Sequence, residues 1–135
     1  MELQVGVKVL LKNPEGKYLV IRRAAGSDPA AAQKWDIPGG RINADSELIK
    51  NLIREVGEET GLEMTSTPKL VAAQDIFRSD KEKHIVRLTY TGTAQGIPRL
   101  SEEHTEYQWV AFNDLASLDH LDHYVKELID NKTIS

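Results

Sequence analysis

The stretch from Gly40 to Leu62 reads GRINADSELIKNLIREVGEETGL. Its apolar residues recur three and four positions apart, which predicts an amphipathic helix from about Ser46 to Thr60. Gly61 follows at the position where a left-handed C-terminal cap is usual. The buried face of this helix is expected to consist of Leu48, Ile49, Leu52, Ile53 and Val56.

Three carboxylates, those of Glu55, Glu58 and Glu59, lie largely off that face and are expected to point towards a polar surface. Residues three and four apart on a helix are neighbours, so Glu55 faces both Glu58 and Glu59. Like charges this close repel one another, and a bound cation would relieve the repulsion. Mg²⁺ is typically held by a few carboxylates together with substrate phosphates. The cluster favours a metal-dependent reaction on a phosphate ester or anhydride; taken alone, it also fits an ordinary acidic helix surface.

The residues around this helix help to decide between a metal site and an ordinary acidic surface. Trp35 to Gly40 reads WDIPGG before it, and Thr60 to Leu62 reads TGL after it. Together they resemble the Nudix box of the MutT-like Nudix hydrolases, G-x5-E-x7-R-E-U-x-E-E-x-G-U, where U is a bulky aliphatic residue. The residues in register are Gly40, Arg54, Glu55, Val56, Glu58, Glu59, Gly61 and Leu62.

One position departs from the box. The first Glu should follow Gly40 by six residues, where this chain has Ser46, with Glu47 next to it. Using Glu47 instead would break the spacing to Arg54, so we interpret Ser46 as a true substitution. In the family the first Glu supports the site and the later ones hold the metal, so the resemblance implies an intact metal site.

The resemblance implies a set of site residues. Glu55, Glu58, Glu59 and the Gly39 carbonyl would hold Mg²⁺ or Mn²⁺. Arg54 would pair with Glu58 and orient the cluster. Many members carry a further Glu before a late strand with Trp-Val, and Glu103 best matches it, with Glu106 as the second choice and an acidic solvent loop as the alternative. The proton acceptor would be one of the helix residues Glu55, Glu58 and Glu59, or else Glu103.

Other residues are candidates for substrate contacts. Gly39 and Gly40 allow a ligand to approach the backbone closely. Arg22 or Arg23 could hold a phosphate through its planar guanidinium, or both could be surface charges on a strand end. Two further groups are weaker candidates. His120 and His123 could ligate a metal, but they are more simply interpreted as surface histidines. Trp35, Phe77 and Tyr90 could stack on a base, but they are more simply interpreted as core aromatics.

The remaining chain predicts a strand-rich domain. Strands are expected at 5–11, 18–21, 35–37, 70–77, 84–93 and 107–112, with a surface loop from Ala24 to Gln33 and a polar loop from 100 to 106. Asn113 and Asp114 are expected to cap a helical turn, and Asp119 to start a closing helix. With the resemblance, this indicates a single domain over 1–135 of the α/β class, a mixed β-sheet sandwiched between helices.

Composition restricts the partners. The net charge of −4 and the lack of a basic run argue against binding polymeric nucleic acid. The absence of cysteine excludes disulfides, zinc-thiolate sites and a cysteine nucleophile. No targeting segment or membrane-length apolar run is evident, so we expect a cytoplasmic monomer or homodimer that does not contact a membrane.

The expected function is a metal-dependent pyrophosphohydrolase that cleaves the diphosphate linkage of a nucleoside diphosphate derivative. Nucleoside triphosphates, damaged ones included, are the first substrate class and nucleotide sugars the second. The alternative is a non-catalytic Nudix-fold domain that binds a nucleotide or a protein, which only Ser46 favours.

Overall fold

The computed structural model describes residues 1–26 and 32–135 of the chain. Part of the loop expected from Ala24 to Gln33, residues 27–31, lies outside them. In chain order the elements are β1 (Glu2–Lys12), β2 (Tyr18–Arg23), β3 (Trp35–Asp36), β4 (Gly39–Arg41), α1 (Leu48–Thr60), β5 (Lys69–Arg78), η1 (Ser79–Lys81), β6 (Lys83–Thr93), β7 (His104–Val110), α2 (Phe112–Leu115) and α3 (His123–Asp130).

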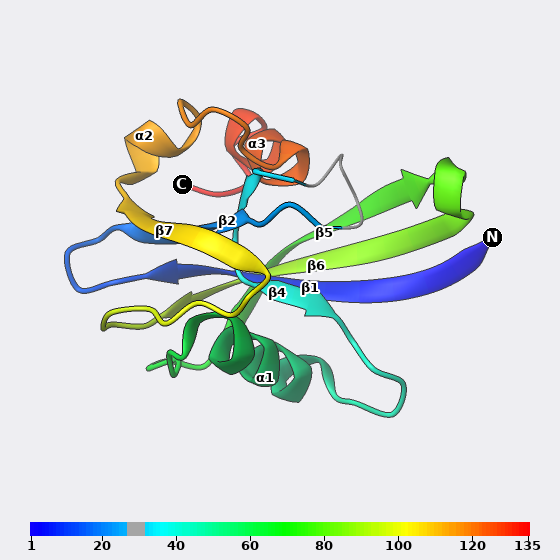
Figure 1. Ribbon diagram of the computed structural model, residues 1–135, viewed down its shortest axis with the longest axis horizontal. Helices are drawn as coiled ribbons and strands as arrows, with labels where there is room; N and C mark the ends of the chain where they lie inside the picture. The colour runs from blue at the N-terminus through cyan, green and yellow to red at the C-terminus, as the bar shows by residue number, and fades with distance from the viewer. Residues whose placement is uncertain (27–31) are drawn as a thin grey trace.

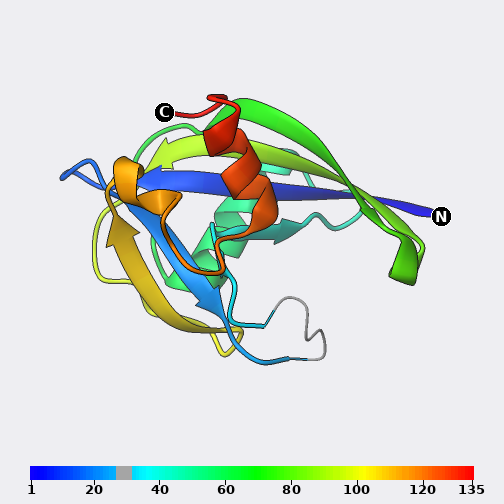
Figure 2. The same ribbon diagram turned by 90° about the horizontal axis from the view of Figure 1, so that it is seen from above.

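The strands of the described residues form one mixed sheet between two helical layers. Its central order is β3-β2-β1-β6-β5, with β4 paired to β1 and β7 paired to β2. Figure 1 shows α1 on one side of the strands and α2 and α3 on the other. Figure 2, seen from above, shows α3 lying across the strands. The predicted mixed sheet sandwiched between helices is confirmed.

The strand that pairs with β1 on one side changes along its length, and this places β4, with the glycine pair at the start of the box, beside β1. It runs parallel to β6 from Glu2↔Lys83 to Lys12↔Thr93, but its registered pair with β2 is Lys12↔Tyr18. In its middle, β1 pairs with β4 instead, which sets Gly39 opposite Lys8. The backbone of the glycine pair therefore lies between β1 and the helix that follows it.

Two apolar cores follow from the alternation of side chains along β1. Val7, Val9 and Leu11 face α1, where they pack with Leu52 and Val56. Leu10 faces the opposite layer and packs in a second core with residues of α2 and α3, including Leu115, Val125 and Leu128. Successive strand residues point to opposite faces, so one strand supplies both cores.

Helix α1 begins two residues later than the expected start at Ser46 and ends at Thr60 as expected. Gly61 adopts φ 69° and its N–H donates to the Gly57 carbonyl, which confirms the predicted cap. The expected apolar face is only partly correct, because Ile53 is 52% exposed while Asn51 and Glu59 are buried.

The late strand was expected at 107–112 and is found at His104–Val110. The polar loop expected at 100–106 is therefore wrong for residues 104–106, which belong to the strand. Residues His104 and Glu106 pair with Arg23 and Arg22 of β2. Backbone pairing with a neighbouring strand accounts for a strand that the polar composition did not predict.

The closing segments also start elsewhere than predicted. Helix α2 begins at Phe112 after Ala111, without a side-chain cap from Asn113 or Asp114. Helix α3 begins at His123, because the Asp122 carboxylate accepts from the N–H groups of Tyr124 and Val125. No helix of the described residues has the length and apolar character needed to span a bilayer.

A network of buried charges joins the sheet to α3. Asp36 lies 3.2 Å from Lys8 Nζ and 3.1 Å from Arg87 Nη2, and Arg87 Nη1 lies 3.0 Å from Asp122 Oδ2. Burial alone would raise the pKa of Asp36, but the charges of Lys8 and Arg87 outweigh it and lower this pKa to about 2. Burial and Asp36 raise the pKa of Asp122, while Arg87 opposes the rise.

Replacing Arg87 with Leu should lower the free energy of unfolding by about 3–5 kcal/mol, because Asp36 and Asp122 lose the cation between them while staying buried. Urea denaturation at pH 7 measures this loss. The exposed Arg41 serves as control, and Arg41→Leu should change stability by only about 0.5 kcal/mol. Equal losses in the two variants would contradict a structural role for the network.

Candidate active site

The glycine pair lies directly against α1. The Gly39 N–H donates to Glu59 Oε1 at 2.8 Å. Gly39 has φ 139°, and a Cβ there would overlap the Val7 carbonyl oxygen. A Cβ on Gly40 would lie 2.9 Å from the carboxyl carbon of Glu55. Glycine at both positions thus lets the loop approach the carboxylates of the helix.

Glu59 differs from the other carboxylates of the box. Its side chain is buried, with 5% of the residue exposed, so the expectation that all three carboxylates point to a polar surface is wrong for Glu59. Burial raises the pKa of Glu59 to about 7, helped by Glu55 and Asp36 and opposed by Lys8 and the Gly39 N–H. Such a perturbed carboxylic acid is typical of functional sites.

Arg54 organises the other two carboxylates of the box, the exposed Glu58 and the half-buried Glu55. Its Nη1 donates to both carboxylate oxygens of Glu58 at 3.0 Å, which confirms the expected pair. Its Nη2 donates to Glu55 Oε1 and to Asn51 Oδ1, both at 3.1 Å. Asn51 was not identified from the sequence; a polar residue among the apolar positions of the helix was the available signal.

Glu103 and His104 come to Glu59 from β7 and the segment before it. One ligand atom from each of the three residues lies within 4.8 Å of the others. Glu106, the second choice for the outer carboxylate, instead lies 3.6 Å from Arg22 Nη1. The described residues therefore bring Glu103, rather than Glu106, together with the box.

His104, a member of this cluster, was not identified from the sequence. Only 6% of it is exposed, and its Nδ1 is a buried atom without a hydrogen-bond partner among the described residues. Burial lowers the pKa of His104 to about 4, with Lys8 and Arg23 acting in the same direction. The ring is neutral at pH 7 and keeps a lone pair that can bind a metal or a proton. Its place beside Glu103 was the only signal in the sequence.

Lys8 is the second residue that was missed. Its Nζ donates to the carbonyl oxygens of Ile37 at 3.2 Å and Gly39 at 3.5 Å, in addition to its pair with Asp36. One ammonium group therefore contacts the oxygen expected to bind a metal and the buried charge network. A lysine inside an otherwise apolar strand was the signal that could have identified it.

The two arginines proposed for phosphate binding are placed differently. Arg22 donates through Nε to the Gln33 carbonyl at 3.2 Å, pairs with Glu106, and lies 5.6 Å from the ring centroid of Trp35. Arg23 lies opposite His104 in the β2–β7 pairing, at the end of β7 that carries the site.

The other candidates do not belong to this cluster. Trp35 and Tyr90 are buried, as the core interpretation expected, whereas Phe77 is exposed and stacks on His84 with ring centroids 4.5 Å apart. His120 precedes α3, with φ 62°, so it does not share a helix with His123 as expected. Both of these histidines are exposed.

Ser46 and Glu47 lie at the start of α1. The Ser46 N–H donates to the Asn43 carbonyl at 3.1 Å. The Glu47 carboxylate lies 3.7 Å from Lys50 Nζ at the surface. Among the described residues, neither of the two forms a hydrogen bond or ion pair with Arg54, whose partners are Asn51, Glu55 and Glu58.

Comparison with known proteins agrees with the box and the fold. The family model of the NUDIX domain matches residues 2–131. The MutT protein of Methanosarcina mazei Go1 is 30% identical and superposes with a TM-score of 0.84 over 96% of this chain and 92% of that one.

Two curated relatives are enzymes by name. An RNA pyrophosphohydrolase of Mesorhizobium japonicum is 33% identical over 93 residues, 67% of this chain and 53% of that protein. A CTP pyrophosphohydrolase of Escherichia coli is 39% identical over 51 residues, 38% of this chain and 36% of that protein. The chain thus spans about half, or less, of the length of these relatives.

Replacing Glu59 with Gln should stabilise the metal-free protein above pH 7. A folded-state pKa of about 7, above the ordinary 4.5, means that ionisation costs stability as the pH rises from about 4 to above 7. The amide can still accept from Gly39 but does not ionise, so the gain at pH 8 should be roughly 2–3 kcal/mol and should vanish near pH 4.

Thermal unfolding in chelator at both pH values tests this expectation. The control is Glu58→Gln, because Glu58 is exposed and should change stability by about 0.5 kcal/mol or less at either pH. If the Glu59→Gln protein were no more stable than wild type at pH 8, the pKa of Glu59 would not be raised by the fold.

Ser46→Glu should strengthen the site, since it restores the first Glu of the box that this chain lacks. Glu47→Gln should be nearly silent, because Glu47 engages Lys50 at the surface. Mn²⁺ titration of both variants measures their metal affinity and shows whether the missing first Glu weakens the site or Glu47 already replaces it. A marked loss in Glu47→Gln would show instead that Glu47 already replaces the missing carboxylate.

Proposed function

This chain belongs to the NUDIX family, and from this premise we propose that it is a divalent-metal-dependent pyrophosphohydrolase of nucleoside diphosphate derivatives. The observation that carries the proposal is the meeting of Glu59, held by the Gly39 N–H, with Glu103 and His104. The box and a distant segment of the chain supply these residues, and the family is shown by the match over residues 2–131.

The donor set suits a hard divalent cation. Carboxylate oxygens from Glu59 and Glu103 are ligands that Mg²⁺ and Mn²⁺ prefer, and a neutral His104 nitrogen is tolerated by Mn²⁺. Glu55, Glu58 and the Gly39 carbonyl complete the proposed set from the box. When bound, the cation would neutralise phosphate charge and lower the pKa of a water molecule.

The protein side of the reaction follows from the contacts. Glu103 would accept the proton of the attacking water, since it lies at the cluster and its carboxylate is exposed to solvent. Arg54 would act as a positioning residue by fixing Glu55 and Glu58. Arg23, next to His104 in the pairing, is the better placed of the two arginines for a substrate phosphate.

Water would attack one phosphorus of the anhydride, and the bond from that phosphorus to the bridging oxygen would break. A nucleoside triphosphate would give a nucleoside monophosphate and pyrophosphate, and a nucleotide sugar would give two phosphate monoesters. We place nucleoside triphosphates first, damaged ones included, and nucleotide sugars second. The RNA and CTP pyrophosphohydrolase names of two relatives support a nucleotide substrate.

We further propose that the protein acts in the cytoplasm as a monomer or homodimer. The lack of cysteine agrees with a reducing compartment. Ser46 is the one feature that favours the second candidate, a nucleotide-binding domain without catalysis.

Turnover should require Mg²⁺ or Mn²⁺, and Glu103→Gln should lower kcat about 10²–10⁴-fold, the usual contribution of a positioned base. The matched control is Glu106→Gln, which removes a carboxylate paired with Arg22 and should keep kcat near wild type. Release of phosphate or pyrophosphate from a panel of nucleoside triphosphates and nucleotide sugars measures both.

Full activity in excess chelator would exclude the metal. A large loss only in Glu106→Gln would move the base to that residue. Nucleotide-induced stabilisation without turnover of any substrate would favour the binding domain.

A further inference from the structure

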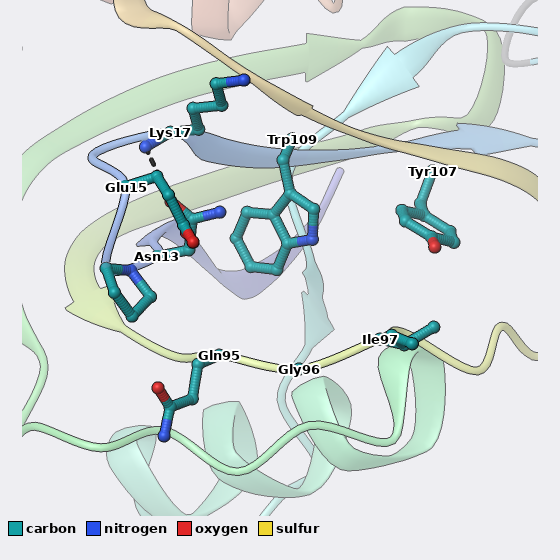
Figure 3. A pocket seen from close by; sticks show the side chains of 9 residues that line it. Asn13, Glu15, Lys17, Gln95, Gly96, Ile97, Tyr107 and Trp109 are labelled. Carbon is teal, nitrogen blue, oxygen red and sulfur yellow. Dashed lines mark hydrogen bonds between the residues drawn. The ribbon is translucent and has the colours of Figure 1, made fainter.

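A groove lies on the α1 side of β7, separate from the carboxylate cluster. Its volume is about 820 Å³, within the range of small-molecule sites. Figure 3 shows Tyr107 and Trp109 facing the segment 95–97, with the turn of residues 13–17 at one end. The turn is held by the Lys17 N–H, which donates to Asn13 Oδ1 at 2.8 Å.

The groove exposes apolar surface of Tyr107 and Ile97, while Trp109 also packs against the core under α1. Tyr107 and Trp109 are two residues apart on β7, so their rings project from the same face. Tyr107 is 38% exposed, and Ile97 on the facing segment is 81% exposed. An aromatic pair facing an aliphatic side chain is a surface on which a flat ring can stack.

Both walls of the groove lead to the proposed site. The Arg99 N–H donates to the Thr60 carbonyl and the Ser101 N–H to the Glu59 carbonyl, so the segment that carries Ile97 is fastened to the end of α1. The other wall, β7, begins at His104. Tyr107 lies three strand residues further on, roughly 10 Å along the strand.

Charge distinguishes the groove from the phosphate end of the site. One carboxylate, Glu15, and one ammonium group, Lys17, line it and balance each other, so a phosphate would find no net attraction there. We propose that the groove binds the nucleobase of the substrate, stacked on Tyr107 beside Trp109, while the phosphates lie at Glu59 and Glu103. This inference rests on the proposed function and adds the subsite that would read the base.

Calorimetric titration with AMP, CMP, GMP and UMP, in the presence of Mg²⁺, tests the subsite without turnover. Ribose 5-phosphate is the matched probe that lacks a base. Tyr107→Ala should weaken the best-bound monophosphate by about 5- to 150-fold, the usual effect of losing one base–aromatic stack, and leave ribose 5-phosphate unchanged. Tyr107→Phe should bind like wild type, because it keeps the ring.

Phe77→Ala is the control for loss of an exposed aromatic residue, since Phe77 lies on β5 outside the groove. It should bind every probe like wild type. A nucleoside monophosphate should also change the tryptophan emission, because Trp109 lines the groove, whereas the other tryptophan, Trp35, is buried.

Unchanged monophosphate binding in Tyr107→Ala would overturn the proposal, and so would an equal loss in Tyr107→Phe. If Tyr107→Ala weakened the binding of UDP-glucose but left the binding of UMP unchanged, the groove would be assigned to a sugar and the base assignment would be overturned. Hydrolysis is measured separately on the wild-type protein. Its absence would refute the proposed activity, while the binding result would still decide the nature of the groove.

Discussion

Asp36 is the point through which the layers of this protein are held to one another. Its carboxylate meets Lys8 of β1 and Arg87 of β6, and Arg87 in turn meets Asp122 at the start of α3. Buried ions are expensive to strip of water, so each requires its partners in place before the interior is stable. The same Lys8 ammonium contacts the Gly39 carbonyl, so the charges that position α3 also position the loop against the box.

Periodicity and a terminal glycine were enough to predict α1 to within two residues, because both act within a single turn of chain. Alternation predicted most strands for the same local reason, whereas their arrangement in a mixed sheet was implied by the family resemblance. The start of β7 could not be found in this way, since polar residues there become strand only by pairing with Arg22 and Arg23. Likewise the start of α3 depends on which of several nearby acids turns its carboxylate to the helix, and this is Asp122.

The candidate site shows the same difference between residues predicted from local sequence and residues that depend on distant parts of the chain. The spacing of the box placed Glu59 and the Gly39 backbone in one motif, and the structure joins them by a hydrogen bond. Lys8 and His104 escaped notice because their significance comes from residues far along the chain, such as Ile37 for Lys8. The result is a carboxylate kept where its charge is disfavoured, beside a neutral imidazole. A fold selected for stability alone would not retain such a pair, and this favours a role in chemistry.

The parallel pairing of β1 with β6 has a consequence for the order in which the molecule assembles. Glu2 meets Lys83 and Lys12 meets Thr93, so most of the chain must be made before the first strand gains this neighbour. The hairpin of β5 and β6 joins adjacent segments and can close early, whereas bringing β1 to it closes a long loop. Until β6 is made, the edge of β1 that will pair with it stays open, and an open edge can pair with another chain, so slow completion of the sheet would favour aggregation.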